Sequence, residues 1–215
     1  MSASVRARTL ATLAESFAEH IREADREVDE RRDYGPGIGP HKERDQLEAL
    51  VERVGTEDTP IARLDTEVPY PGRSERCDLV VSTAEARIPV EAKLLRFRRA
   101  NGNDEPEGYA KVFSPVKPSG SLVTDSEKLR TSGFRSAGGL LGIHYSAGTE
   151  ETPADATRLA EKVGRDVSFW YGFDLETVAV ESFDGLRHDV HDRGAIIAWA
   201  LPESDDQQTG QQELY

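Results

Sequence analysis

Apolar residues recur along the chain with two spacings, one typical of helices and one typical of strands. Between residues 4 and 32 they return every three or four positions, which predicts an amphipathic helix. The same spacing predicts a second helix from about His41 to Val54. The GPGIGP segment at residues 35–40 predicts a hinge between them, because glycine and proline do not continue a helix and no GK[ST] follows as in a phosphate loop.

Shorter apolar segments with alternating or continuous hydrophobicity predict six strands. The first three, 61–70, 77–82 and 84–97, are joined by short turns and should form an antiparallel meander. A polar loop from Arg99 to Gly120 and a helix over 121–133 lead to a fourth strand, 138–147. A helix within 153–173 precedes the closing strands, 176–183 and 195–201, and the polar tail, 202–215, is expected to be disordered.

This order of elements predicts a mixed α/β (α+β) protein built on one central sheet. We expect an N-terminal helix over 1–34 and one domain over 39–201, a size that 215 residues accommodate. No apolar stretch approaches the roughly 18 residues of a membrane span, and no secretory signal is recognisable. The single cysteine excludes an internal disulfide framework. Together these features favour a cytoplasmic protein without a membrane partner.

The charge balance is unusual, with 40 acidic residues against 27 basic ones and a net charge of −13. Only six of the basic residues are lysines, and 21 are arginines. This composition favours adaptation to high intracellular salt; an ordinary acidic protein is the alternative. The net charge argues against a polyanionic partner, but molar salt screens repulsion to within a few Å, so local charge decides.

Three charged residues interrupt the second and third predicted strands. Glu91 and Lys93 are two positions apart and share one face of their strand. A turn centred between Ala84 and Glu85 would bring Asp78 opposite Glu91. Two carboxylates and an ammonium are then expected to converge on an open face of the sheet.

Adjacent buried carboxylates are unfavourable unless a positive charge lies between them. Mg²⁺ suits this position, with Mn²⁺ as a substitute, bound by Asp78, Glu91 and the carbonyl of Ala92. Lys93 would orient or deprotonate a water, and the metal would stabilise charge on a phosphate. The alternative is a surface ion pair between Glu91 and Lys93, since E-x-K is common by chance.

These residues and their order resemble the PD-(D/E)xK nuclease superfamily, which has the restriction-endonuclease-like fold. Its core is αβββαβ, and Asp78 in "CD" with Glu91 and Lys93 in "EAK" match its motif over roughly residues 39–146. Cys77 stands where the family loosely keeps a proline. The resemblance implies that Asp78 and Glu91 bind the metal and that Lys93 activates the water.

The family often adds a glutamate from the helix before the sheet. Glu43, Glu48 and Glu52 are candidates here. Glu43 shares the core-facing stripe of the predicted helix and is the first choice, with Glu48 second. A first-turn glutamate favoured by the helix dipole is the alternative.

Basic residues follow the motif, beginning with KLLRFRR, which contains no acid. Such a patch would neutralise phosphates beside the scissile one; solvated side chains that balance acids elsewhere are the alternative. The long loop after Arg99 is expected to be a binding segment or a lid. His188 and His191 are too weak a pattern to indicate zinc. The candidate nucleic-acid-binding residues are Arg96, Arg98, Arg99, Lys111, Lys117, Lys128 and Arg130.

The sequence therefore predicts a Mg²⁺-dependent endonuclease acting on DNA, with a restriction or defence role favoured by analogy of fold. A homodimer is expected to form through the N-terminal helix. One alternative is a non-catalytic module that binds nucleic acid or protein on the same fold. Another is a junction-resolving, repair or RNA-directed nuclease.

Overall fold

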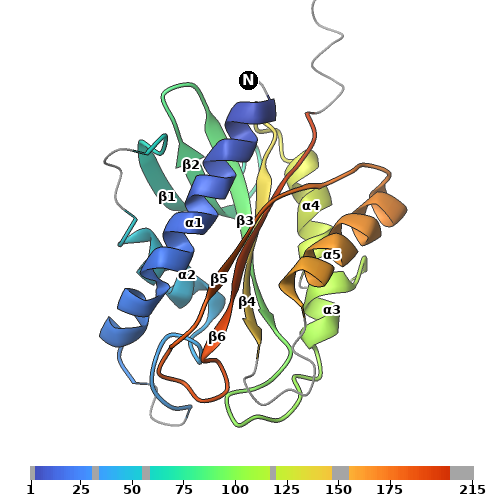
Figure 1. Ribbon diagram of the computed structural model, residues 1–215. Helices are drawn as coiled ribbons and strands as arrows, with labels where there is room; N and C mark the ends of the chain where they lie inside the picture. Colours follow the sequence, from blue (N-terminus) through green and yellow to red (C-terminus); the bar gives the residue numbers. More distant parts are fainter. Residues whose placement is uncertain (1–2, 31–33, 55–58, 117–119, 147–154, 204–215) are drawn as a thin grey trace, which may run out of the picture.

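A six-stranded mixed sheet forms the centre of the protein and carries helices on both faces (Figure 1). This confirms the mixed α/β class. The computed structural model describes residues 3–30, 34–54, 59–116, 120–146 and 155–203. The elements are α1 (Ala3–Glu27), α2 (Glu43–Val51), β1 (Arg63–Pro69), β2 (Arg76–Ser82), β3 (Arg87–Arg96), α3 (Gly108–Phe113), α4 (Leu122–Arg130), β4 (Gly139–Ser146), α5 (Ala156–Tyr171), β5 (Glu176–Phe183) and β6 (Arg193–Ala200).

The strands follow the order β1-β2-β3-β4-β6-β5, and β3 runs parallel to β4 while every other pair is antiparallel. The parallel step is made through α4, as a parallel connection requires a crossover. The series α2, β1, β2, β3, α4, β4 has the expected αβββαβ order. The segment from Arg99 to Gly120 is not a loop throughout, because it contains α3, which is anchored by the fully buried Val112.

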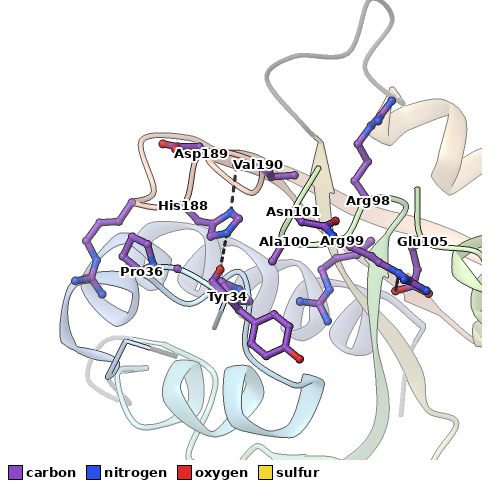
Figure 2. A pocket seen from close by; sticks show the side chains of 14 residues that line it. Tyr34, Pro36, Arg98, Arg99, Ala100, Asn101, Glu105, His188, Asp189 and Val190 are labelled. Carbon is purple, nitrogen blue, oxygen red and sulfur yellow. Dashed lines mark hydrogen bonds and ion pairs between the residues drawn. The ribbon is translucent and has the colours of Figure 1, made fainter. Parts of the chain in front are cut away.

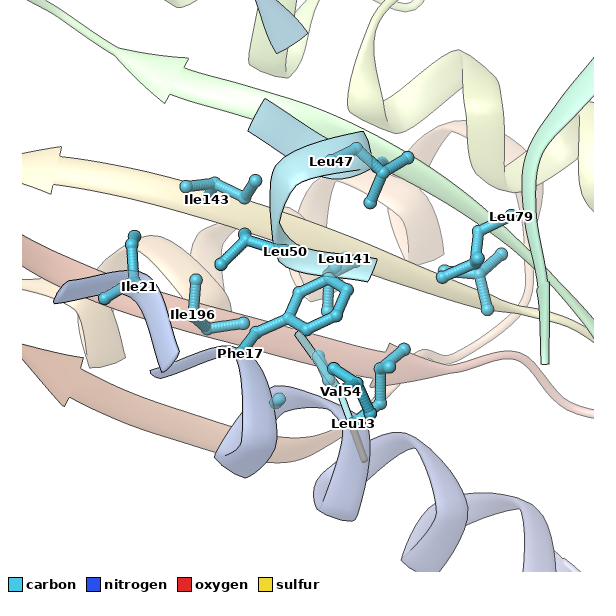
Figure 3. Close-up of a cluster of buried hydrophobic side chains, with 14 of the residues drawn as sticks. Leu13, Phe17, Ile21, Leu47, Leu50, Val54, Leu79, Leu141, Ile143 and Ile196 are labelled. Carbon is cyan, nitrogen blue, oxygen red and sulfur yellow. The ribbon is translucent and has the colours of Figure 1, made fainter. Parts of the chain in front are cut away.

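Two hydrophobic clusters hold the helices to the sheet. On one face, Phe17 of α1 and Leu50 of α2 pack with Leu141 of β4 (Figure 3). On the other face, Leu129 of α4 belongs to the cluster around Trp199 of β6. The apolar stripe of α1 is fully buried within this chain, so it is not exposed as the dimer interface expected from the sequence.

The pairing of β2 with β3 has the predicted register. Leu79 pairs with Val90 and Ser82 with Arg87, and the Thr83 N–H donates to the Ala86 carbonyl across the turn at 2.8 Å. These are the pairs that a turn centred between positions 84 and 85 requires. The register therefore places Asp78 opposite Glu91, one position beyond the Leu79–Val90 pair that ends the ladder.

Candidate active site

The candidate site lies where the ladder between β2 and β3 ends. Beyond Leu79 and Val90, carboxylates accept from two N–H groups on the edge of β3 that faces away from β4. Asp78 Oδ2 accepts from the Ala92 N–H at 2.8 Å, and Glu43 Oε2, from the first residue of α2, accepts from the Leu94 N–H at 2.7 Å. Because N–H groups two residues apart point to the same edge of a strand, Asp78 and Glu43 lie along one side of β3.

Lys93 projects from β3 between two acids. Its Nζ lies 3.0 Å from Asp125 Oδ2 and 3.6 Å from Glu43 Oε1, and 16% of its side chain is exposed. Burial lowers the pKa of Lys93, but the charges of Asp125 and Glu43 outweigh burial, so the pKa is raised overall. Lys93 is therefore a protonated ammonium at neutral pH, which suits it to hold a water or phosphate rather than to remove a proton.

Glu91 is buried in the same cluster, with only 3% of its surface exposed. Its Oε1 accepts from the Tyr70 hydroxyl and lies 2.9 Å from Lys128 Nζ. Burial raises the pKa of the Glu91 carboxyl to about 8, with further contributions from the charge of Asp78 and a hydrogen bond to it. This carboxyl is therefore poised between its protonated and ionised forms near neutral pH.

The expectation of an open face is wrong, because α4 packs over this end of β3. Asp125 and Lys128 are three residues apart on α4 and so reach down from the same side of the helix. Ser121 caps the helix: its hydroxyl accepts from the Thr124 N–H. The strand pattern could not reveal this cover, since alternation gives a strand's two faces but not what packs on them.

Two members of the cluster, Tyr70 and Asp125, were not among the predicted site residues. The spacing of Asp125 and the predicted Lys128 on one helix could have indicated Asp125. Tyr70 follows β1 and carries no periodic signal, yet it is 2% exposed and holds Glu91. Burial, and then the charge of Glu91, raise the pKa of the Tyr70 hydroxyl, so Tyr70 acts as a hydrogen-bond donor.

A small cavity of about 40 Å³ borders Asp78, and its lining also includes Glu43, Glu48 and Glu67, with Arg44 as a counter-charge. Glu67 has φ of +54°, which makes it the only non-glycine residue in the described part of the chain with positive φ. Strained backbone of this kind is found often at functional sites. The cavity has room for a few water molecules among carboxylates.

The donors present fit a hard divalent cation. Mg²⁺ commonly takes one or two protein carboxylates and keeps several waters, and Asp78 and Glu91 offer two carboxyls in contact. Ala92 lies at the same point through its N–H bond to Asp78. Within the described residues, no three His, Cys, Asp or Glu side chains are grouped to hold a metal by themselves. The remaining ligands would be water or substrate oxygens.

The remaining predicted site residues lie in three places: on the surface, along the clefts, or outside the described residues. Glu48 forms a surface ion pair with Arg44 at 2.8 Å, whereas Glu43 turns inward to β3. Arg130 pairs with Glu127 on α4 and lies over the ring of Phe173. Lys117 lies outside the described residues. Arg96, Arg98, Arg99 and Lys111 line the two clefts described below.

Comparisons with known protein families, curated proteins and solved structures find no match for this chain. No helix in the described part of the chain is both long enough and apolar enough to span a membrane. Function is therefore inferred from the geometry and chemistry of the site.

Proposed function

We propose that this chain is a metal-dependent nuclease that hydrolyses DNA phosphodiester bonds, with a site of the PD-(D/E)xK type. The observation that carries the proposal is the meeting of Asp78, Glu91 and Lys93 at the end of the β2–β3 ladder. Glu43 joins them from the preceding helix. A surface ion pair would not require Glu91 to be buried beside a second acid.

Each residue of the site has a separate role in the proposed reaction. Asp78 and Glu91 would hold Mg²⁺ or Mn²⁺, which supplies charge neutralisation at a phosphate and a lowered pKa for water. Lys93 directs a positive charge and N–H donors toward the same place, where they can orient the attacking water and stabilise developing charge. Tyr70 and Lys128 fix the position of Glu91.

A basic cleft beside the site supports a nucleic-acid substrate despite the negative net charge. It encloses about 280 Å³, and four basic residues outnumber the two acids Glu43 and Glu105 in its lining: Lys42, Lys93, Arg96 and Lys111. Cations so arranged neutralise successive phosphates and position a strand without reading its sequence.

A non-catalytic binding module is the second candidate, and one observation favours it. Lys93 and Lys128 both have carboxylate partners, so the cluster already carries internal compensation without a metal. A restriction or defence role, and a homodimer, remain predictions.

Nuclease assays on the full-length chain separate the two candidates. Plasmid, single-stranded and branched DNA are incubated at high salt with Mg²⁺, Mn²⁺ or EDTA. We expect metal-dependent cleavage that falls at least about 100-fold in Asp78→Asn and Lys93→Met, because each removes a group at the reacting centre. Glu23→Gln, which alters an exposed carboxylate on α1 outside the cavity beside Asp78, is the control and should cleave normally. Absence of cleavage by the folded wild-type protein on all substrates would favour the binding module.

A further inference from the structure

A second, larger cleft adjoins the candidate active site. It encloses about 880 Å³ between residues 34–40, the chain that leaves β3, and the loop between β5 and β6. Figure 2 shows Tyr34 and His188 on one wall and Arg99, Asn101 and Glu105 on the other. Arg96 and Glu105 line both clefts, so the larger cleft is next to the one that contains Lys93.

Two buried histidines tie the walls of this cleft together. His188 Nδ1 accepts from the Val190 and His191 N–H groups, which leaves Nε2 to donate to the Tyr34 carbonyl at 2.9 Å. His191 Nε2 lies 3.1 Å from the Arg98 carbonyl. Burial lowers the pKa of His191 to about 4, so its ring is neutral at physiological pH. The HDVH sequence is therefore a scaffold for the cleft rather than a zinc site.

The glycine-rich wall is also fixed, which corrects the expectation of a hinge. Asp25 is 1% exposed and accepts from the Ile38 N–H at 2.8 Å and the Arg187 N–H at 2.9 Å. Gly37 has φ of +82°, and a Cβ there would lie 2.2 Å from Asp25 Oδ1. Segments 34–40 and 187–190 are thus joined through one buried carboxylate, and the cleft is preformed.

The lining combines an accessible aromatic ring with guanidinium groups. Tyr34 is 52% exposed although it lines the cleft, and the Arg99 side chain is likewise 52% exposed. Aromatic rings that stack on bases, beside basic groups that follow the backbone, are the means by which proteins bind unpaired nucleotides. A continuous duplex keeps its bases stacked inside and cannot offer one to such a ring.

We propose that this cleft holds an unpaired nucleotide of the DNA adjacent to the phosphate at Lys93. Tyr34 stacks on its base, and Arg96 and Arg99 contact its phosphates. The preferred substrate is then DNA with unpaired nucleotides at the cleavage position, such as a single strand, an overhang or a flap. The inference rests on the proposed function for the identity of the polymer.

Binding measurements without metal test the cleft independently of cleavage. Fluorescent single-stranded, overhang and blunt duplex DNA of matched sequence are titrated with the full-length protein in EDTA. We expect Tyr34→Ala to weaken single-strand and overhang binding about 10-fold or more, since stacking contributes about 1–3 kcal/mol per base. Tyr34→Phe should retain binding. Trp170→Ala removes an aromatic of similar exposure, 53%, that does not line the cleft, and should change nothing.

A salt titration tests the phosphate contact. Arg99→Gln should reduce the slope of log affinity on log salt by about 0.7, the value for one lost contact on a single strand. Arg22→Gln is the control, because its side chain is also 52% exposed and lines no part of this cleft. Blunt duplex bound as tightly as single strands, or Tyr34→Ala indistinguishable from Trp170→Ala, overturns the proposal.

The two proposals fail separately. Metal-dependent cleavage of duplex DNA without any effect of Tyr34 overturns the cleft and leaves the nuclease. Tyr34-dependent binding of single strands without cleavage overturns the nuclease and leaves a single-strand-binding module.

Discussion

Replacing Glu91 with glutamine is expected to change how protein stability depends on pH. Glutamine has the shape of glutamate, and its amide oxygen can accept from Tyr70 and Lys128 as the carboxylate does. Its amide N–H groups can donate to Asp78. The substitution therefore keeps the hydrogen-bond pattern and removes only the titration of a buried acid.

The size of the effect follows from the pKa of Glu91. Burial and the neighbouring Asp78 raise the pKa of this carboxyl to about 8 in the folded protein, from 4.5 in a solvated chain. Between these pH values the folded protein holds a proton that the unfolded chain releases. The free energy of unfolding should therefore fall as pH rises through this window, by up to about 5 kcal/mol. Below pH 4.5 and above pH 8 this group adds no slope.

Denaturant unfolding at pH values from 5 to 9, without metal, measures the difference. Tryptophan fluorescence reports the transition, because Trp199 is fully buried in the core. The free energy of unfolding of Glu91→Gln minus that of wild type should increase with pH up to about pH 8. Glu48→Gln changes an exposed carboxylate in a surface ion pair and should follow the wild type throughout.

Parallel curves of unfolding free energy against pH for wild type and Glu91→Gln would refute the raised pKa of Glu91. They would mean that Glu91 is ionised at every pH tested and is neutralised by Lys128 as a buried ion pair. Loss of one charge from such a pair costs about 3–5 kcal/mol irrespective of pH, and the variant would then be uniformly less stable.

Three further results are expected. Calorimetry should show Mg²⁺ affinity rising about 10-fold per pH unit below pH 8, because Glu91 must lose its proton to bind a cation; a flat profile would contradict this. Tyr70→Phe removes a hydrogen bond that lowers the pKa of Glu91, so the midpoint of that profile should move upward, with about 1 kcal/mol of stability lost in denaturant unfolding. Gly37→Ala should lower the free energy of unfolding by about 1–3 kcal/mol and weaken single-strand binding, because the added Cβ would clash with Asp25. Gly172 has a similar φ but open space around it, so Gly172→Ala should leave binding unchanged.

The sequence was most informative where local rules determine geometry. Side chains alternate along a strand, and a short turn fixes which residues of two strands pair, so the register between β2 and β3 could be predicted. The inward position of Glu43 followed from helical periodicity. Both properties depend on neighbours in the chain and not on distant packing.

Long-range contacts could not be predicted in this way. Tyr70 reaches Glu91 across 21 positions in the chain, and Asp125 reaches Lys93 only because α4 packs over β3. The glycine-rich segment was expected to be a hinge, yet Asp25, 13 positions away, accepts a hydrogen bond from it. Each contact brings a polar group from a distant segment, and neither composition nor periodicity encodes such pairings.

The arrangement of acids at the end of β3 argues for a ligand rather than for structure alone. Asp78 and Glu43 complete the hydrogen bonds of the β3 peptide groups, but that role requires neither Glu91 nor Lys93. Burying Glu91 against Asp78 raises the free energy of the ionised state, which a purely structural sheet end would avoid with glutamine or an apolar residue. A divalent cation would offset the part of that cost that Lys93 and Lys128 leave. A cluster of buried acids with only partial compensation, beside a basic cleft, is what the proposed cation site requires.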